Sequence, residues 1–273
     1  MPFSRRPEEM LEELVGHETV VGRPNLSLMG AVADWLEGHG MSCRILTGPE
    51  GDRANLFATI GDATRPGYVL SGHVDVVPAG EPEWQADPFR LRRTDERLIG
   101  RGACDMKGFV AAVLAAAPEL AEMKPAVPIH IALSYDEEAG CKGVPHMIAA
   151  MPEICAPPLG CIVGEPTGLV PVLAHKGKAA LRLRARGVAG HSSRPDLGAN
   201  AIHAMLPVLV AAQAQAQALE AEGPRDDRFA PPWSSLQIGT VAGGQALNII
   251  PERAEAEIEA RAIAGAEPRA LLA

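Results

Sequence analysis

Helical and strand-like hydrophobic patterns alternate along the first part of the chain. In four segments apolar residues recur every three or four positions, the pattern of helices that bury one face. These segments are residues 7–14, 26–37, 109–120 and 144–150. Short and almost wholly apolar runs, typical of buried strands, occupy residues 43–46, 55–60, 68–71, 129–134 and 160–163. The alternation predicts an α/β fold with a mixed, mostly parallel sheet flanked by helices on both faces.

The pattern changes after about His175. Ala179–Arg186 alternates apolar and basic residues, as a half-exposed strand does. Further elements are predicted in the order helix, strand, strand and the start of a helix. Their residues are 199–219, 235–241, 254–263 and 267–273. This order is typical of a small α+β sandwich that is still incomplete. We therefore expect two domains, residues 1–176 and residues 177–273.

Charged side chains follow three of the predicted strands of the first domain. They are His73 and Asp75, Glu137 and Glu138, and Glu165. In open α/β sheets the functional loops gather at the carboxyl ends of the strands. The sequence thus predicts a functional site at this edge of the sheet.

His73 and Asp75 lie two positions apart in an extended segment, so their side chains are expected to point the same way. The carboxylate could then support the imidazole and fix its tautomer, as a metal ligand requires. The alternative is a polar strand end with a histidine whose hydrogen bonds are satisfied within the fold.

Asp105 lies in the glycine-rich segment Gly100–Gly108, directly before a predicted helix. The glycines permit tight turns and a close approach of the backbone to a site. A loop in which Asp105 caps the helix explains the same pattern. Lys107 is interpreted as a surface residue at the start of that helix.

Asp136, Glu137 and Glu138 are three consecutive carboxylates directly after an apolar strand. Bringing them together is unfavourable unless a cation neutralises part of their charge. One can then bind a metal while its neighbour acts as general base toward water. The alternative is an acidic loop in solvent.

Oxygen ligands together with imidazole favour zinc, cobalt or manganese. A serine hydrolase is not indicated, because the sequence contains no Gly-x-Ser-x-Gly motif. The formal net charge of −9 argues against a nucleic-acid partner. Five cysteines without regular spacing predict no disulfide framework. Neither a signal peptide nor a membrane span is predicted, and we expect a cytoplasmic protein.

These segments together resemble the M20 family of metallopeptidases and deacylases, over essentially the whole chain. The matching blocks are Gly-Arg-Gly-Ala-Cys-Asp-Met-Lys-Gly-Phe, Ser-Tyr-Asp-Glu-Glu-Ala-Gly-Cys-Lys-Gly, Gly-Glu-Pro-Thr, Ala-His-Lys-Gly, Gly-His-Ser-Ser-Arg-Pro and Asn-Ile-Ile-Pro. Within the family they most resemble the acetylornithine deacetylases. The succinyl-diaminopimelate desuccinylases are the nearest alternative.

The resemblance implies a zinc-peptidase fold whose catalytic domain carries an inserted lid and dimerisation domain. It implies two Zn²⁺ ions, or Co²⁺ or Mn²⁺ in their place. His73 and Glu165 would hold one metal, Glu138 the other, and Asp105 both, with a cis peptide bond between Asp105 and Met106. Asp75 would orient His73.

The resemblance also implies the chemistry. Glu137 would be the general base that deprotonates a water and returns the proton to the leaving amine. His191, in the lid, would stabilise the oxyanion, often across a homodimer interface. Asn248 and Arg261 match lid positions that contact the substrate. The expected reaction converts N2-acetyl-L-ornithine to L-ornithine and acetate. Other substrates would be N-acyl amino acids of a desuccinylase or an aminoacylase.

One family ligand has no counterpart among these residues. In the family the chain returns from the lid to the catalytic domain and supplies a last histidine to the second metal, and no residue here matches it. We therefore expect both domains to be incomplete, the second metal to be held weakly, and apolar surface to be exposed. A different class of function follows as an alternative: a chain that binds metal or a partner through the lid without catalysis.

Overall fold

The chain folds into two compact units, which the computed structural model describes for residues 3–273. The division falls after Val170, so that the second unit is Pro171–Ala273. The sequence pattern places this division slightly later, after residue 176. Each unit has its own sheet and its own hydrophobic core.

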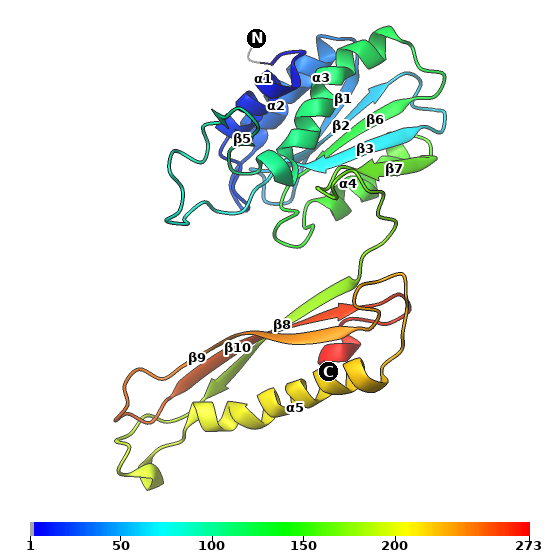
Figure 1. Cartoon of the computed structure of the whole chain (residues 1–273). Coiled ribbons are helices and arrows are strands. Elements are labelled where there is room, and N and C mark those ends of the chain that lie inside the picture. Colours follow the sequence, from blue (N-terminus) through cyan, green and yellow to red (C-terminus); the bar gives the residue numbers. More distant parts are fainter. Residues whose placement is uncertain (1–2) are drawn as a thin grey trace. The chain divides into compact units, whose positions relative to one another are not determined.

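A five-stranded mixed sheet forms the centre of the first unit, in the order β1-β2-β6-β3-β7 (Figure 1). The strands are β1 (Ser42–Thr47), β2 (Ala54–Ile60), β3 (Tyr68–His73), β6 (Ile129–Ser134) and β7 (Gly160–Val163). Strand β3 runs parallel to both of its neighbours, β6 and β7. Strands β1, β2 and β6 pair antiparallel. The predicted α/β fold with a mixed sheet is confirmed.

Helices cover both faces of this sheet. They are α1 (Pro7–Gly16), α2 (Leu26–Glu37), α3 (Gly108–Glu122) and α4 (Val144–Ala150). Helices α1, α2 and α3 share one large core with the sheet face that carries Leu56 and Ile131. On the opposite face, Met147 of α4 packs with Phe57 and Ala132. Because adjacent strand residues point to opposite faces, both sides of a sheet with continuously apolar strands are buried.

Strand β7 is an edge strand and carries apolar side chains in solvent. Ile162 is 56% exposed and Val163 is 57% exposed. Exposed apolar surface is thus present in the first unit, as the sequence pattern predicts.

The second unit pairs an antiparallel sheet with one long helix. The sheet has the order β8-β10-β9. Its elements are β8 (Gly177–Arg186), α5 (Ala201–Glu222), β9 (Ser235–Gly243) and β10 (Arg253–Ala262). Residues of α5 such as Met205 pack against Ala254 and Ala256 of β10. The other face of the sheet is charged, with ion pairs such as Arg184 to Glu255 at 2.8 Å.

By length and composition alone, α5 could cross a membrane, which the sequence pattern did not indicate. Its buried positions are Ala201, Met205 and Ala212, spaced as expected for a helix that packs one face on a sheet. Asn200 caps the helix, because its side chain accepts a hydrogen bond from the backbone N–H of His203.

Several short elements were not predicted. They are β4 (Arg92–Arg93), β5 (Leu98–Ile99), η1 (Ala103–Lys107), η2 (Met151–Glu153), η3 (Pro195–Leu197) and η4 (Ala270–Leu272). The helix predicted over residues 267–273 is limited to the single turn η4. Elements this short carry too few residues for a hydrophobic period to be detected.

Candidate metal centre

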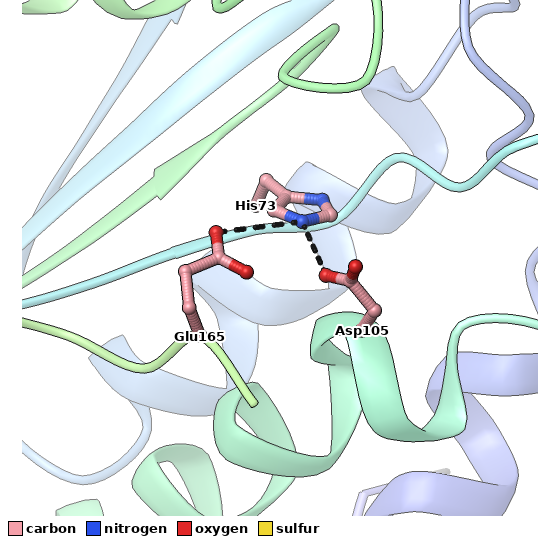
Figure 2. A group of neighbouring side chains, drawn as sticks. All are labelled: His73, Asp105 and Glu165. Carbon is pink, nitrogen blue, oxygen red and sulfur yellow. Dashed lines mark hydrogen bonds and ion pairs between the residues drawn. The ribbon is translucent and has the colours of Figure 1, made fainter. Parts of the chain in front are cut away.

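Three side chains from separate segments converge at the carboxyl end of the sheet. His73 is the last residue of β3, Asp105 lies in the turn η1, and Glu165 follows β7 (Figure 2). One ligand atom from each lies within 4.8 Å of the other two. His73 Nε2 is 3.1 Å from Asp105 Oδ1 and 3.9 Å from Glu165 Oε1. The parallel arrangement of β3 and β7 therefore brings two of the predicted ligands together.

The backbone of Asp75 fixes the tautomer of His73. His73 Nδ1 donates a hydrogen bond to the carbonyl oxygen of Asp75 at 2.9 Å. The imidazole is buried, and its Nε2 faces the two carboxylates. This is the orientation that a metal-binding histidine requires.

The carboxylate of Asp75 lies beside His73 and also contacts the acidic segment. Its Oδ1 lies 3.6 Å from His73 Nδ1, beyond hydrogen-bond distance. The two carboxylate oxygens instead accept the backbone N–H groups of Glu137 and Glu138, at 3.1 Å each. Asp75 thus orients His73 chiefly through its carbonyl group, and its side chain holds the acidic segment next to the site.

Glycine at position 102 gives the Asp105 turn its shape. Gly102 has φ +74°, and a Cβ atom there would lie 2.2 Å from Val76 Cγ1. The peptide bond from Asp105 to Met106 is cis, as the resemblance implies. The turn leaves the side chain of Asp105 half exposed while Met106 is fully buried beneath it.

Lys107 is buried, and its interpretation as a surface residue is wrong. Its Nζ donates to the carbonyl oxygens of Leu14 and His17, at 2.8 Å each. Carbonyl groups at the C-terminus of a helix carry partial negative charge, so they attract an ammonium group. Burial lowers the pKa of Lys107 to about 7, although the charge of Asp75 opposes this shift.

The pKa values show an excess of negative charge in the cluster. Burial and the charge of Asp105 raise the pKa of Glu138. Burial also raises the pKa of Glu165 to about 6, supported by the charges of Asp105 and Glu137 and opposed by that of His73. For His73, burial lowers the pKa, but the nearby carboxylate and the carbonyl group of Asp75 and the bond to Asp105 raise it to about 9 overall.

These shifts fit a site for a divalent cation. The carboxylates resist ionisation and the imidazole favours its protonated form, so the cluster favours additional positive charge at its centre. One imidazole and two carboxylates are a donor set that zinc, cobalt and manganese accept. The residues present therefore fit the metal that their pattern predicts.

Glu137 and Glu138 lie beside this group of three. Both are half-buried, and the charge of each acts on the cluster. The thiol of Cys141 donates to Glu137 Oε1 at 3.3 Å. Glu138 is not among the three side chains whose ligand atoms lie within 4.8 Å, so its role as a ligand stays a prediction.

The remaining predicted site residues belong to the second unit. His191 is exposed, and its Nδ1 lies 2.8 Å from Ser193 Oγ. The carbonyl oxygen of Asn248 accepts the N–H of Ser192, and Arg261 pairs with Glu259 at 2.9 Å. Their roles toward the substrate stay predictions.

Known proteins share both the sequence pattern and the fold. Residues 69–268 match the model of peptidase family M20/M25/M40. The chain is 36% identical over 267 residues to the acetylornithine deacetylase of Myxococcus xanthus, which covers 94% of this chain and 67% of that protein. It is 36% identical over 242 residues to the acetylornithine deacetylase of Vibrio cholerae, which covers 88% of this chain and 62% of that protein.

Solved structures share the fold at lower sequence identity. An M20 family metallo-carboxypeptidase from Sulfolobus solfataricus matches 98% of this chain and 73% of its own, with a TM-score of 0.77 and 16% identity. Human carnosine dipeptidase 1 matches 97% of this chain and 72% of its own, with a TM-score of 0.66 and 18% identity. The chain spans 61–67% of the length of the curated relatives it matches. By its sequence match and its fold, the chain belongs to peptidase family M20/M25/M40.

Proposed function

We propose that the chain contributes the metal centre of an amidohydrolase that converts N2-acetyl-L-ornithine and water to L-ornithine and acetate. The observation that carries this proposal is the convergence of His73, Asp105 and Glu165, with Glu137 beside them. The substrate is proposed from relatives that are named acetylornithine deacetylase and are 34–36% identical to this chain over the aligned residues.

Four side chains would hold two metal ions. His73 and Glu165 would hold the first, Glu138 would hold the second, and Asp105 would serve both. When bound, such ions polarise the amide carbonyl group and lower the pKa of water. Zinc, cobalt and manganese all suit the donor set.

Glu137 would carry the proton. Its carboxylate lies beside the cluster but outside the group of three ligands. It takes a proton from the attacking water and passes it to the amine nitrogen as the amide bond breaks. Asp75 keeps this carboxylate in place through the backbone N–H of Glu137.

The second unit would act as lid and dimerisation domain of a cytoplasmic homodimer. In this proposal His191 stabilises the oxyanion, and Asn248 and Arg261 contact the substrate. The exposure of His191 supports a role toward another surface.

The test is ornithine release from N2-acetyl-L-ornithine after Co²⁺ or Zn²⁺ is added to the metal-free chain. We expect release that stops on chelation and falls about 10²–10⁴-fold in Glu137→Gln, the range for loss of a general base. Glu153→Gln, which changes an exposed carboxylate outside the site, should keep the wild-type rate. Turnover that survives chelation would contradict the proposal.

Two further outcomes identify the alternatives. Faster hydrolysis of N-succinyl-diaminopimelate than of N2-acetyl-L-ornithine would change the proposed substrate but not the proposed metal-dependent amide hydrolysis. Metal binding without turnover of any N-acyl amino acid would favour a binding or dimerisation module.

A further inference from the structure

The side chain of Asp136 bonds to residues outside the metal cluster, although Asp136 directly precedes Glu137 and Glu138. Its side chain is buried, and its Oδ1 accepts the backbone N–H of Gly22 at 2.8 Å. Its Oδ2 accepts a hydrogen bond from Nη1 of Arg53. Asp136 also has φ +51°, a conformation that is unfavourable for a residue with a side chain. The local fold must therefore hold this residue in place.

Arg53 lies in the turn between β1 and β2 and is held there by several contacts. Its side chain is only 15% exposed. Its Nε donates to Asp52 at 3.1 Å, and its Nη2 lies 3.8 Å from Glu50. The guanidinium carbon is 5.8 Å from the centre of the Tyr135 ring, and the Tyr135 hydroxyl donates to Glu50 at 3.0 Å. These contacts hold the guanidinium group of Arg53 in one position beside Asp136.

The segment Asp136–Glu138 is thus anchored from two sides. On one side Asp75 accepts the N–H groups of Glu137 and Glu138. On the other side Arg53 and Gly22 bind the carboxylate of Asp136. Because contacts hold this segment at Asp136 and at the two N–H groups that follow it, the backbone position of both glutamates is fixed.

We propose that Arg53 is a positioning residue for Glu137 and Glu138, acting through its buried ion pair with Asp136. This inference rests on the proposed function, in which these glutamates are base and ligand. Arg53 acts from outside the site and makes none of the contacts within the His73, Asp105 and Glu165 cluster.

This pair is much less exposed than the ion pairs on the sheet of the second unit. The side chains of Arg53 and Asp136 are 15% and 3% exposed, whereas those of Arg182 and Glu257 on the second unit are 52% and 43% exposed. Loss of one member of an exposed pair has little effect, because water solvates the other. Loss of Arg53 leaves the carboxylate of Asp136 buried with only the Gly22 N–H as partner, which favours local opening.

Hydrogen–deuterium exchange of the metal-free chain tests the proposal without needing turnover. In Arg53→Met we expect amide exchange over residues 134–142 to rise about tenfold or more, while peptides from α1 and the second unit keep their rates. Arg53→Lys keeps a cation near Asp136 and should restore much of the protection. Arg182→Met is the matched control and should exchange like the wild type.

Cobalt titration of the same variants links the segment to the site. When Glu138 is present, Arg53→Met should weaken the binding of Co²⁺, and Arg53→Lys should recover the affinity. When Glu138 is replaced by Gln, Arg53→Met should cause no further loss of Co²⁺ affinity. Unchanged exchange over residues 134–142, or a uniform rise over the whole first unit, would overturn the proposal. A chain that binds metal and shows the local exchange effect but hydrolyses nothing would contradict the proposed function alone.

Discussion

The backbone and the side chain of Asp75 contact different groups of the site. The carbonyl oxygen leaves His73 Nε2 free for a metal, and the carboxylate holds two amides of the acidic segment. A spacing of two residues was enough to predict that Asp75 and His73 interact. It could not show which atoms do so, because Glu137 and Glu138 approach from a strand that is distant in the sequence.

Gly102 allows a prediction about the Asp105 turn. Gly102→Ala should lower the free energy of unfolding by about 1–3 kcal/mol and weaken metal binding, because the new Cβ would meet Val76. Urea unfolding of the first unit and cobalt titration are the measurements. Gly140→Ala is the control, since Gly140 also has positive φ (+93°) but nothing lies within 4 Å of its added Cβ. Equal losses of stability and metal affinity in the two variants would show that the effect comes from backbone conformation alone and not from the contact with Val76.

His130 gives the fold a dependence on pH. It is fully buried in β6, with Nδ1 bonded to Thr59 at 2.9 Å, and burial lowers its pKa. Its Nε2 has no hydrogen-bond partner among residues 3–273. The unfolded chain binds a proton at about pH 6.5 whereas the folded chain resists it, so stability should fall as the pH drops below that value.

The measurement is the free energy of unfolding of the metal-free chain at several pH values between 7.5 and 5. His130→Gln, which cannot titrate, should be less stable than the wild type at pH 7.5, and the gap should narrow as the pH falls. A gap that stays constant over this range would exclude His130 as a source of the pH dependence.

At the scale of elements, helix α5 depends on its cap. Asn200→Ala removes the acceptor for the His203 N–H and should destabilise the second unit by about 1 kcal/mol. Thermal unfolding and amide exchange at the first turn of α5 would measure this. Asn200→Asp retains an acceptor oxygen and should behave like the wild type. No change in Asn200→Ala would mean that packing on the sheet alone fixes the start of the helix.

The main elements could be predicted because each has a hydrophobic period long enough to detect. The helix over residues 26–37 and the strand over 129–134 match α2 and β6 in both bounds. The contacts of Lys107 and Arg53 could not be predicted. Lys107 and Arg53 have polar side chains that are buried by partners distant in sequence. The hydrophobic pattern of a short segment does not identify such partners. The candidate ligands His73 and Glu165 were found because strand ends converge in this type of sheet, and Asp105 was found from its glycine-rich segment and the family resemblance.

At the scale of the whole molecule, metal binding should stabilise one unit and not the other. His73, Asp105 and Glu165 all lie in the first unit, which has its own core. A free metal concentration of 100 times Kd should stabilise that unit by about 2.7 kcal/mol. Calorimetry with and without Zn²⁺ should therefore shift one unfolding transition and leave that of the second unit in place.

Two histidine variants control this experiment. His73→Ala should abolish the shift, whereas His146→Ala, which changes an exposed residue of α4, should preserve it. A zinc-induced shift of both transitions would mean that the units unfold together.

The open edge at β7 has a consequence for how copies of this chain associate. The exposed Ile162 and Val163 lie on a strand with unpaired backbone groups, which is a template for strand addition. If β7 of one copy pairs with β7 of another, the contact is symmetric and growth stops at two chains. If β7 pairs with the opposite edge, β1, each addition presents a new free edge, and the product is a filament of unlimited length. The strand that pairs with β7, either a second β7 or β1, thus decides between a closed dimer and an open polymer.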